Sequence, residues 1–127
     1  MKGDFNKAKE ISPKTKAIVL DRQYNKSISG VNLYNKEVEF HHVIPRSSSG
    51  VGYEWNVVAL TSEEHRDYTD HRPIKVNGRE YYTWEEFDTL IKNHLKLRYS
   101  GWSEKLCKYH KGWEKEDYKV IRFDVKF

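Results

Sequence analysis

The chain has 127 residues, of which 37% are hydrophobic and 33% are charged, and it carries one cysteine. This length fits a single domain over residues 1–127, and the hydrophobic content is too high for a disordered chain. No apolar run approaches the ~20 residues that cross a bilayer, and no basic stretch followed by an apolar run marks a signal peptide. A lone cysteine excludes an internal disulfide and a cysteine-rich zinc site. We therefore expect a cytoplasmic protein with no membrane partner.

The net charge of +4 is unevenly distributed. Residues 1–36 hold eight Lys or Arg against three Asp or Glu, giving +5. Residues 37–91 hold five against eleven, giving −6, and residues 92–127 hold ten against five, giving +5. Basic ends around an acidic centre suit a polyanionic partner such as nucleic acid. An ordinary solvated lysine-rich surface explains the same charges equally well.

The first third of the chain predicts an arm, a helix and a turn region. Residues 1–11 predict a loose basic arm. Ser12 is a typical N-cap, and Pro13 suits the first helical position, so a helix is expected to continue over residues 14–24. Residues 25–35 contain Gly and Asn and predict turns.

Two strands and a helix are predicted next. Residues 38–44 alternate as a strand does and end before Pro45. Residues 47–52 are rich in Ser and Gly and predict a flexible loop. Residues 57–60 predict a short apolar strand. Thr61 begins a capping-box sequence, with Glu three residues later, so a helix is expected to run from there to about residue 71. This order is a ββα unit.

The last third predicts a hairpin followed by helices. Residues 75–82 contain an Asn-Gly turn between short strands. A second capping-box sequence at Thr83 predicts a helix with apolar residues at helical spacing. A further helix is expected over residues 103–111. Residues 118–127 predict a closing strand, with a frayed tail as the alternative.

Four polar side chains of the ββα unit suggest chemistry. Neighbouring strand residues point to opposite faces, so His41 and His42 would have different roles. His41 would bind a divalent metal, and His42 would act as a base on water. His65, in the first turn of the helix, would complete the metal site. Asn56 would pin the loop or orient His42. Metal and base together would hydrolyse a phosphodiester by in-line attack.

This pattern of His41, His42, Pro45, Asn56 and His65 resembles the HNH, or ββα-metal (His-Me finger), endonucleases. The chain is similar in character to their small phage-type members, which act in a bacterial or phage-infected cell. The resemblance covers about residues 15–72.

The resemblance implies an α+β fold with a ββα-metal core over residues 12–72. The basic arm and a helix would precede the strands. A C-terminal extension over residues 73–127 would add the hairpin and the other helices.

The resemblance also implies roles for particular residues. His42 would be the general base, His41 and His65 the metal ligands, and Asn56 the motif asparagine of the catalytic site. Arg46, directly after the proline, would bind a phosphate.

Two departures from the family pattern are visible. The cysteine pairs that hold a structural zinc in many relatives are absent, so packing must replace that zinc. Some relatives also place a third metal-binding His four residues after the last motif His, where this chain has Thr69. Asp70 or His71 would have to substitute.

The expected function is therefore a divalent-metal-dependent endonuclease that cleaves double-stranded DNA. One site would nick one strand, and a homodimer would be needed for concerted double-strand cuts. Mg or Mn is the favoured ion, with Zn or Ni as alternatives. The alternatives to DNA cleavage are an RNA-directed nuclease or toxin, a non-catalytic nucleic-acid-binding module, and a binding domain built on a structural zinc.

Overall fold

The computed structural model describes residues 5–123 and has a mixed α+β architecture, as predicted. Its helices are α1 (Phe5–Ala8), α2 (Pro13–Arg22), α3 (Ser62–Thr69) and α4 (Trp84–Arg98). Its strands are β1 (Val38–His42), β2 (Val57–Thr61), β3 (Ile74–Val76) and β4 (Arg79–Tyr82). Four short 3-10 turns are η1 (Arg46–Ser48), η2 (Glu54–Asn56), η3 (Glu104–Cys107) and η4 (Lys115–Tyr118). Among the described residues, no helix has the length and apolar character needed to cross a membrane.

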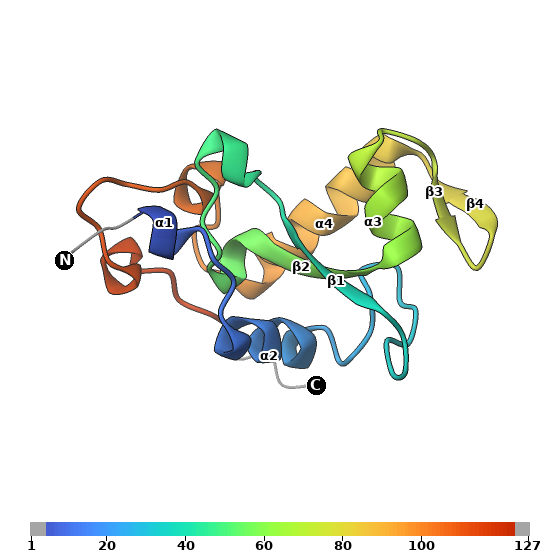
Figure 1. Ribbon diagram of the computed structural model, residues 1–127, viewed down its shortest axis with the longest axis horizontal. Coiled ribbons are helices and arrows are strands. Elements are labelled where there is room, and N and C mark those ends of the chain that lie inside the picture. The colour runs from blue at the N-terminus through green and yellow to red at the C-terminus, as the bar shows by residue number, and fades with distance from the viewer. Residues whose placement is uncertain (1–4, 124–127) are drawn as a thin grey trace.

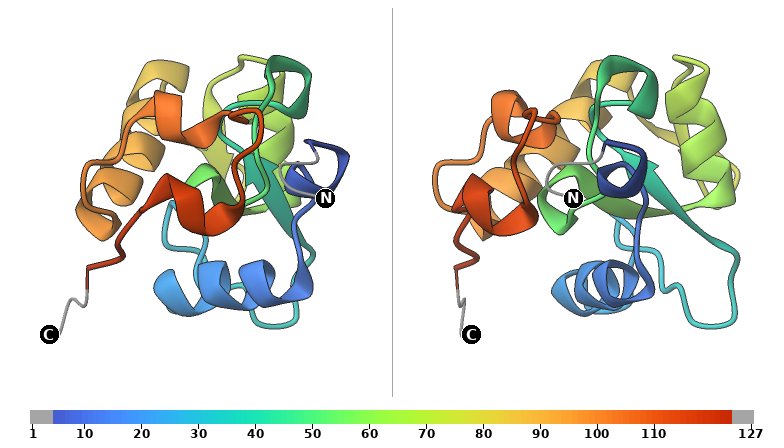
Figure 2. Two further views of the ribbon diagram at one scale, coloured as in Figure 1. Left: turned by 90° about the vertical axis from the view of Figure 1, so that its left-hand side faces the viewer. Right: turned by 60° about the vertical axis from the view of Figure 1, so that its left-hand side comes forward.

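A hairpin of β1 and β2 lies at the centre of the fold. The strands pair antiparallel, from Val38 opposite Thr61 to His42 opposite Val57. Helix α2 lies on one side of this hairpin, and α3 and α4 lie on the other (Figure 1 and Figure 2). The hairpin of β3 and β4 lies at the end of the molecule beyond α3 (Figure 1).

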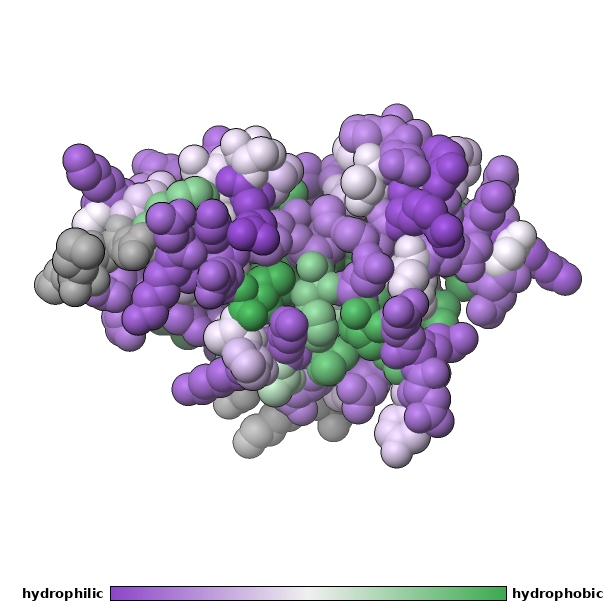
Figure 3. Space-filling model, in the orientation of Figure 1, coloured by the Kyte–Doolittle hydropathy of each residue, from purple (hydrophilic) through white to green (hydrophobic). Residues whose placement is uncertain are grey.

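Alternation along β2 divides the core in two. Val58 and Leu60 belong to a larger apolar cluster that includes Tyr68 of α3 and Phe87 and Ile91 of α4. The other face of β2 belongs to a smaller cluster against α2, made of Val19, Leu33, Val57 and Ala59. Apolar surface between the hairpin and α2 is visible in Figure 3. The smaller cluster itself is buried, and partly buried apolar residues pack against it, namely Ile11, Leu20, Val38 and Phe40. The central hairpin is thus held by packing on both faces.

The predicted starts of three helices are confirmed. The side chains of Ser12, Thr61 and Thr83 each accept a hydrogen bond from the backbone N–H three residues later. The Asn-Gly turn is also confirmed, because Asn77 and Gly78 have φ angles of 51° and 79°, as a two-residue hairpin turn requires. Helix α2, strand β1 and helix α3 each end about two residues earlier than predicted, which is the ordinary error of such boundaries.

The N-terminal segment differs from the expected loose arm. Residues 5–11 include helix α1 and contact the rest of the fold. The Gly52 amide donates to the Ala8 carbonyl at 2.8 Å, and the Lys9 carbonyl lies 2.9 Å from a ring nitrogen of His42. The rest of the expected arm, residues 1–4, lies outside the described residues. The segment is held by these backbone hydrogen bonds and by the packing of Ala8 and Phe5.

The helix expected over residues 103–111 is only the single turn η3. Its carbonyl groups bond to other segments instead of to later amides of a helix. The Trp55 indole donates to the Leu106 carbonyl at 2.7 Å, and the Val51 amide donates to the Cys107 carbonyl at 2.9 Å. Tertiary hydrogen bonds therefore replace the helical ones.

The strand expected over residues 118–127 is also not formed among the described residues. Lys119 has a φ angle of 53° and turns the chain. Beyond it, Arg122 makes one isolated bridge to Tyr99. Residues 124–127 lie outside the described part of the chain.

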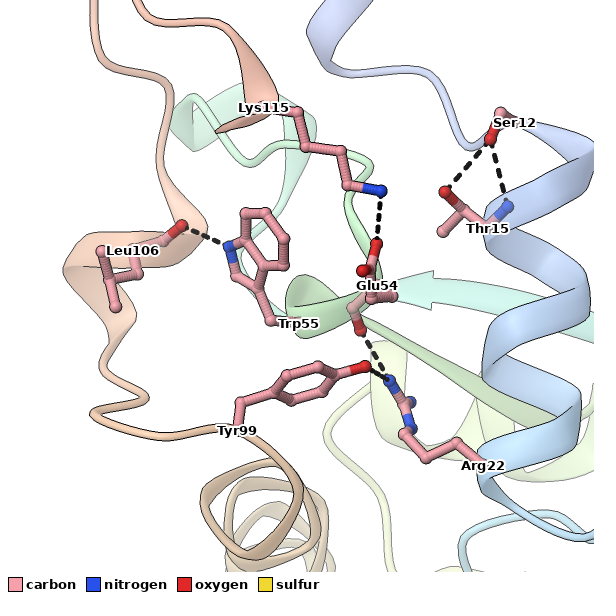
Figure 4. Close-up of polar contacts among 8 residues, drawn as sticks. All are labelled: Ser12, Thr15, Arg22, Glu54, Trp55, Tyr99, Leu106 and Lys115. Carbon is pink, nitrogen blue, oxygen red and sulfur yellow. Dashed lines mark hydrogen bonds and ion pairs between the residues drawn. The ribbon is translucent and has the colours of Figure 1, made fainter. Parts of the chain in front are cut away.

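Arg22 is the largest polar side chain in the core and is only 1% exposed. Its guanidinium has five N–H donors, and each finds an acceptor (Figure 4, which draws two of them). The acceptors are the His94 ring, the Glu54 carbonyl, the Tyr99 hydroxyl, the Gln23 amide oxygen and the Val57 carbonyl. One side chain thus joins α2, η2, β2 and α4.

This network predicts that acid destabilises the fold partly through His94. Burial, with Arg22 and Arg98 nearby, lowers the pKa of His94 from its ordinary 6.5 to about 3. Between these two pKa values, the His94 imidazole is protonated in the unfolded chain and neutral in the folded protein. The free energy of unfolding therefore falls as the pH falls below 6.5. His94→Gln keeps an acceptor for Arg22 and removes this titration. Urea unfolding between pH 7 and pH 4 is expected to show a pH slope smaller by up to about 1.4 kcal/mol per pH unit in the variant. An equal pH dependence of the free energy of unfolding in the wild type and the variant would show that His94 is not the source of the acid sensitivity.

Candidate functional site

An open groove lies where β1 ends, between η1 and α3, with the first half of α4 behind it. Its volume is about 740 Å³, within the range of about 300–1,000 Å³ that is usual for small-molecule sites. Figure 1 shows η1 and α3 on either side of this end of β1. The lining includes five of the residues predicted from sequence, His41, His42, Arg46, His65 and His71. Asn56 and Asp70 do not line it.

His42 is held in one orientation by the N-terminal segment. Its Nε2 lies 2.9 Å from the Lys9 carbonyl oxygen. A carbonyl only accepts hydrogen bonds, so Nε2 carries the proton and Nδ1 keeps its lone pair. Burial lowers the pKa of His42, the Lys9 carbonyl opposes this effect, and Arg46 adds to it. The ring is therefore neutral near pH 7, and no hydrogen bond to its Nδ1 occurs among residues 5–123.

His41 and His65 face each other across the groove from β1 and α3. Their ring centroids are 5.2 Å apart. Burial, followed by the neighbouring His65 and His42, lowers the pKa of His41 to about 4. A neutral imidazole is the form that binds metal.

Glu39 joins this pair, although the sequence argument did not select it. Its carboxylate contacts Nδ1 of His65, which leaves Nε2 of that ring as the nitrogen available to a ligand. The signal was present in the sequence, because Glu39 lies two residues before His41 and so shares its face of the strand.

Aromatic rings form the wall behind His41. The ring of Tyr68 meets His41 edge to face at 5.1 Å. Burial and a hydrogen bond to Asp88 raise the pKa of Tyr68, so its hydroxyl stays protonated and donates to that carboxylate. Trp84 stacks on Tyr68 and on His71, with ring centroids 5.3 Å and 4.4 Å away. Sequence reasoning missed Tyr68, although it lies three residues after His65 on a helix and therefore beside it.

Asn56 is fully buried and pins the loop between the two strands. Its side-chain oxygen accepts from the Ile44 amide at 2.8 Å. Its side-chain nitrogen donates to the Ile44 and Val51 carbonyls at 3.1 Å and 2.7 Å. Of the two roles considered for Asn56, pinning the loop is the one these contacts support. Asn56 thereby ties the chain at Ile44, before the loop over residues 47–52 that was expected to be flexible, and at Val51 within it.

The three remaining candidates lie at the margin of the site. Asp70 pairs with Arg72 at 3.2 Å and does not line the groove. His71 lines the groove and stacks on Trp84. Arg46 is exposed at the start of η1, where it could reach a bound anion.

The donors that the groove offers fit a metal ion in part. Within residues 5–123, no group of three or more His, Cys, Asp or Glu side chains is arranged to hold one. Two imidazoles are suitable, however. With metal–nitrogen bonds of about 2.1 Å at near-tetrahedral angles, two ligating rings have centroids about 5 Å apart. The 5.2 Å between His41 and His65 matches this spacing. Water and substrate oxygens would have to supply the other ligands.

Comparison with known proteins gives no relative for this chain. No protein-family model, no curated protein and no solved structure matches it.

Proposed function

We propose that this protein is a divalent-metal-dependent endonuclease of the ββα-metal type that hydrolyses DNA phosphodiester bonds. The observation that carries the proposal is that one groove holds both a neutral His42 and the facing imidazoles of His41 and His65. Within the described part of the chain, Nδ1 of His42 has no hydrogen-bond partner. A base beside a pair of metal-binding side chains is the arrangement that phosphodiester hydrolysis needs.

Each side chain of the groove has a separate role in the proposed hydrolysis. His42 takes a proton from a water molecule at Nδ1, while its Nε2–H stays bonded to Lys9. The water oxygen attacks phosphorus, the bond to the leaving oxygen breaks, and that oxygen takes a proton from solvent. Arg46 binds a phosphate oxygen at the mouth of the groove. His41 and His65 would hold Mg or Mn, and a bound divalent ion stabilises the charge that develops on phosphate and leaving oxygen.

A second candidate is a nucleic-acid-binding module that does not cleave. One observation favours it, namely that residues 5–123 offer no third protein donor for a metal. Catalytic zinc sites commonly use three protein ligands. Such a module would bind DNA through its basic residues and leave it intact.

The test is cleavage of supercoiled plasmid by metal-stripped protein, with Mg, Mn, Ni and Zn added back separately. The endonuclease is expected to convert plasmid to open circles only when a divalent ion is present. Intact plasmid with every ion, from protein that still retards DNA in a gel, would reject the endonuclease and support the binding module.

Circular dichroism of the metal-stripped protein separates a catalytic from a structural metal. The hairpin of β1 and β2 and helix α4 pack through apolar clusters, so we expect the stripped protein to keep its helical signal. Unfolding on chelation would instead indicate the structural-zinc alternative.

A further inference from the structure

We propose that the N-terminal segment, residues 5–10, positions the ring of His42. We also propose that the small size of Gly52 lets this segment pack closely enough to do so. The effect on cleavage rests on the proposed function. The positioning itself is a property of the free protein and can be tested without any activity.

The first observation is the bond between this segment and the base. His42 ends strand β1, and it is only partly buried. Nε2 of its ring is hydrogen-bonded to the Lys9 carbonyl, 33 residues earlier in the chain. Because the contact uses a main-chain oxygen, it depends on where the segment lies and not on the lysine side chain.

The second observation is the close approach of this segment to Gly52. The Gly52 amide donates to the Ala8 carbonyl at 2.8 Å. A Cβ atom at Gly52 would lie 2.2 Å from the Glu10 carbonyl oxygen and 2.8 Å from the Lys9 carbonyl oxygen. The φ angle of Gly52 is outside the left-handed range. Glycine is therefore required by the approaching backbone and not by its own conformation.

The third observation is that the segment is anchored at its other end as well. Ala8 is 6% exposed and belongs to the larger core cluster. The Phe5 ring packs on Tyr109 with centroids 5.2 Å apart. Figure 2 shows α1 beside the C-terminal part of the chain. Lys9 thus directly follows an anchored stretch of chain, and its carbonyl is hydrogen-bonded to His42.

A methyl group at Gly52 is expected to push residues 9 and 10 away and to break the bond to His42. The Nε2–H would then exchange with water, and the ring would be free to rotate about χ1 and χ2. Gly52→Ala should therefore misplace the base without removing it. Misplacement of a reacting group costs about tenfold to a hundredfold in rate.

Proton NMR of the imidazole N–H groups at neutral pH tests the positioning directly. The wild type should show a slowly exchanging N–H signal for His42, assigned by its loss in His42→Gln. Gly52→Ala should lose this signal, and Phe5→Ala, which loosens only the outer anchor, should weaken it. Lys9→Ala should keep it, because the carbonyl remains. Retention of the signal in Gly52→Ala would overturn the proposal.

Kinetics on plasmid then connect the segment to catalysis. Gly52→Ala should lower kcat by about tenfold or more with little change in KM, because the defect lies in the base and not in binding. An unchanged kcat, despite a lost N–H signal, would show that the segment does not position the reaction. A wild type without cleavage would reject the endonuclease, while the NMR result would still decide whether the segment holds His42.

Discussion

His42→Ala is expected to lower metal-dependent plasmid cleavage by about a hundredfold to ten-thousandfold, the usual contribution of a general base. The neutral ring offers Nδ1 as the acceptor, and the other imidazoles of the groove have other surroundings. His41 and His65 are turned toward each other, and His71 is stacked on Trp84. DNA retardation in a gel should be unchanged, because the basic residues that bind phosphate remain.

His110→Ala is the matched control. His110 is also a partly buried histidine whose Nε2 lies near a backbone carbonyl, that of Lys105, at 3.0 Å. It lies outside the groove lining. We expect wild-type cleavage from this variant. Equal losses in both variants would indicate a general effect on the fold, and full activity in His42→Ala would remove it from the role of base.

Sequence reasoning located those parts of the fold that depend on local rules. The capping boxes at Thr61 and Thr83 and the Asn-Gly turn are short patterns whose hydrogen bonds close within a few residues. The alternation of β1 placed His41 and His42 on opposite faces for the same reason. The groove then receives His41, His42 and His65 because the hairpin and α3 are contiguous in sequence.

What sequence reasoning missed depends on contacts between distant segments. The Lys9 carbonyl that orients His42 has no side-chain signature, since any residue supplies a carbonyl. The sequence of the single turn η3 has a helical pattern, yet its carbonyl groups accept hydrogen bonds from Trp55 and Val51. Arg22 reads as a surface residue at the end of a short helix, because arginine is rarely buried. Its five acceptors come from four segments that meet only in the folded protein.

Arg22→Met is expected to lower the free energy of unfolding by about 3–5 kcal/mol. Methionine fills much of the volume but donates no hydrogen bond. The Glu54 and Val57 carbonyls, which lie 2.7 Å from the guanidinium, then lose their partners in the core. Each buried unsatisfied polar group costs about 1–3 kcal/mol. Burial lowers the pKa of Arg22, a sign that desolvation of its charge is costly, so the variant recovers part of this loss.

The change in the free energy of unfolding depends on two opposing effects, the loss of the hydrogen bonds and the removal of a buried charge. Urea unfolding at pH 7 measures their sum. Replacing a buried ion pair with apolar residues is sometimes neutral, because both charges disappear together. Here the partners are carbonyls, a hydroxyl, an amide and an imidazole, which all remain after the substitution. We therefore expect the lost bonds to dominate. Arg66→Met, at an exposed position of α3, is the control and should change stability by less than about 0.5 kcal/mol. Equal stability of the two variants would mean that the five bonds of Arg22 only offset the cost of burying its charge.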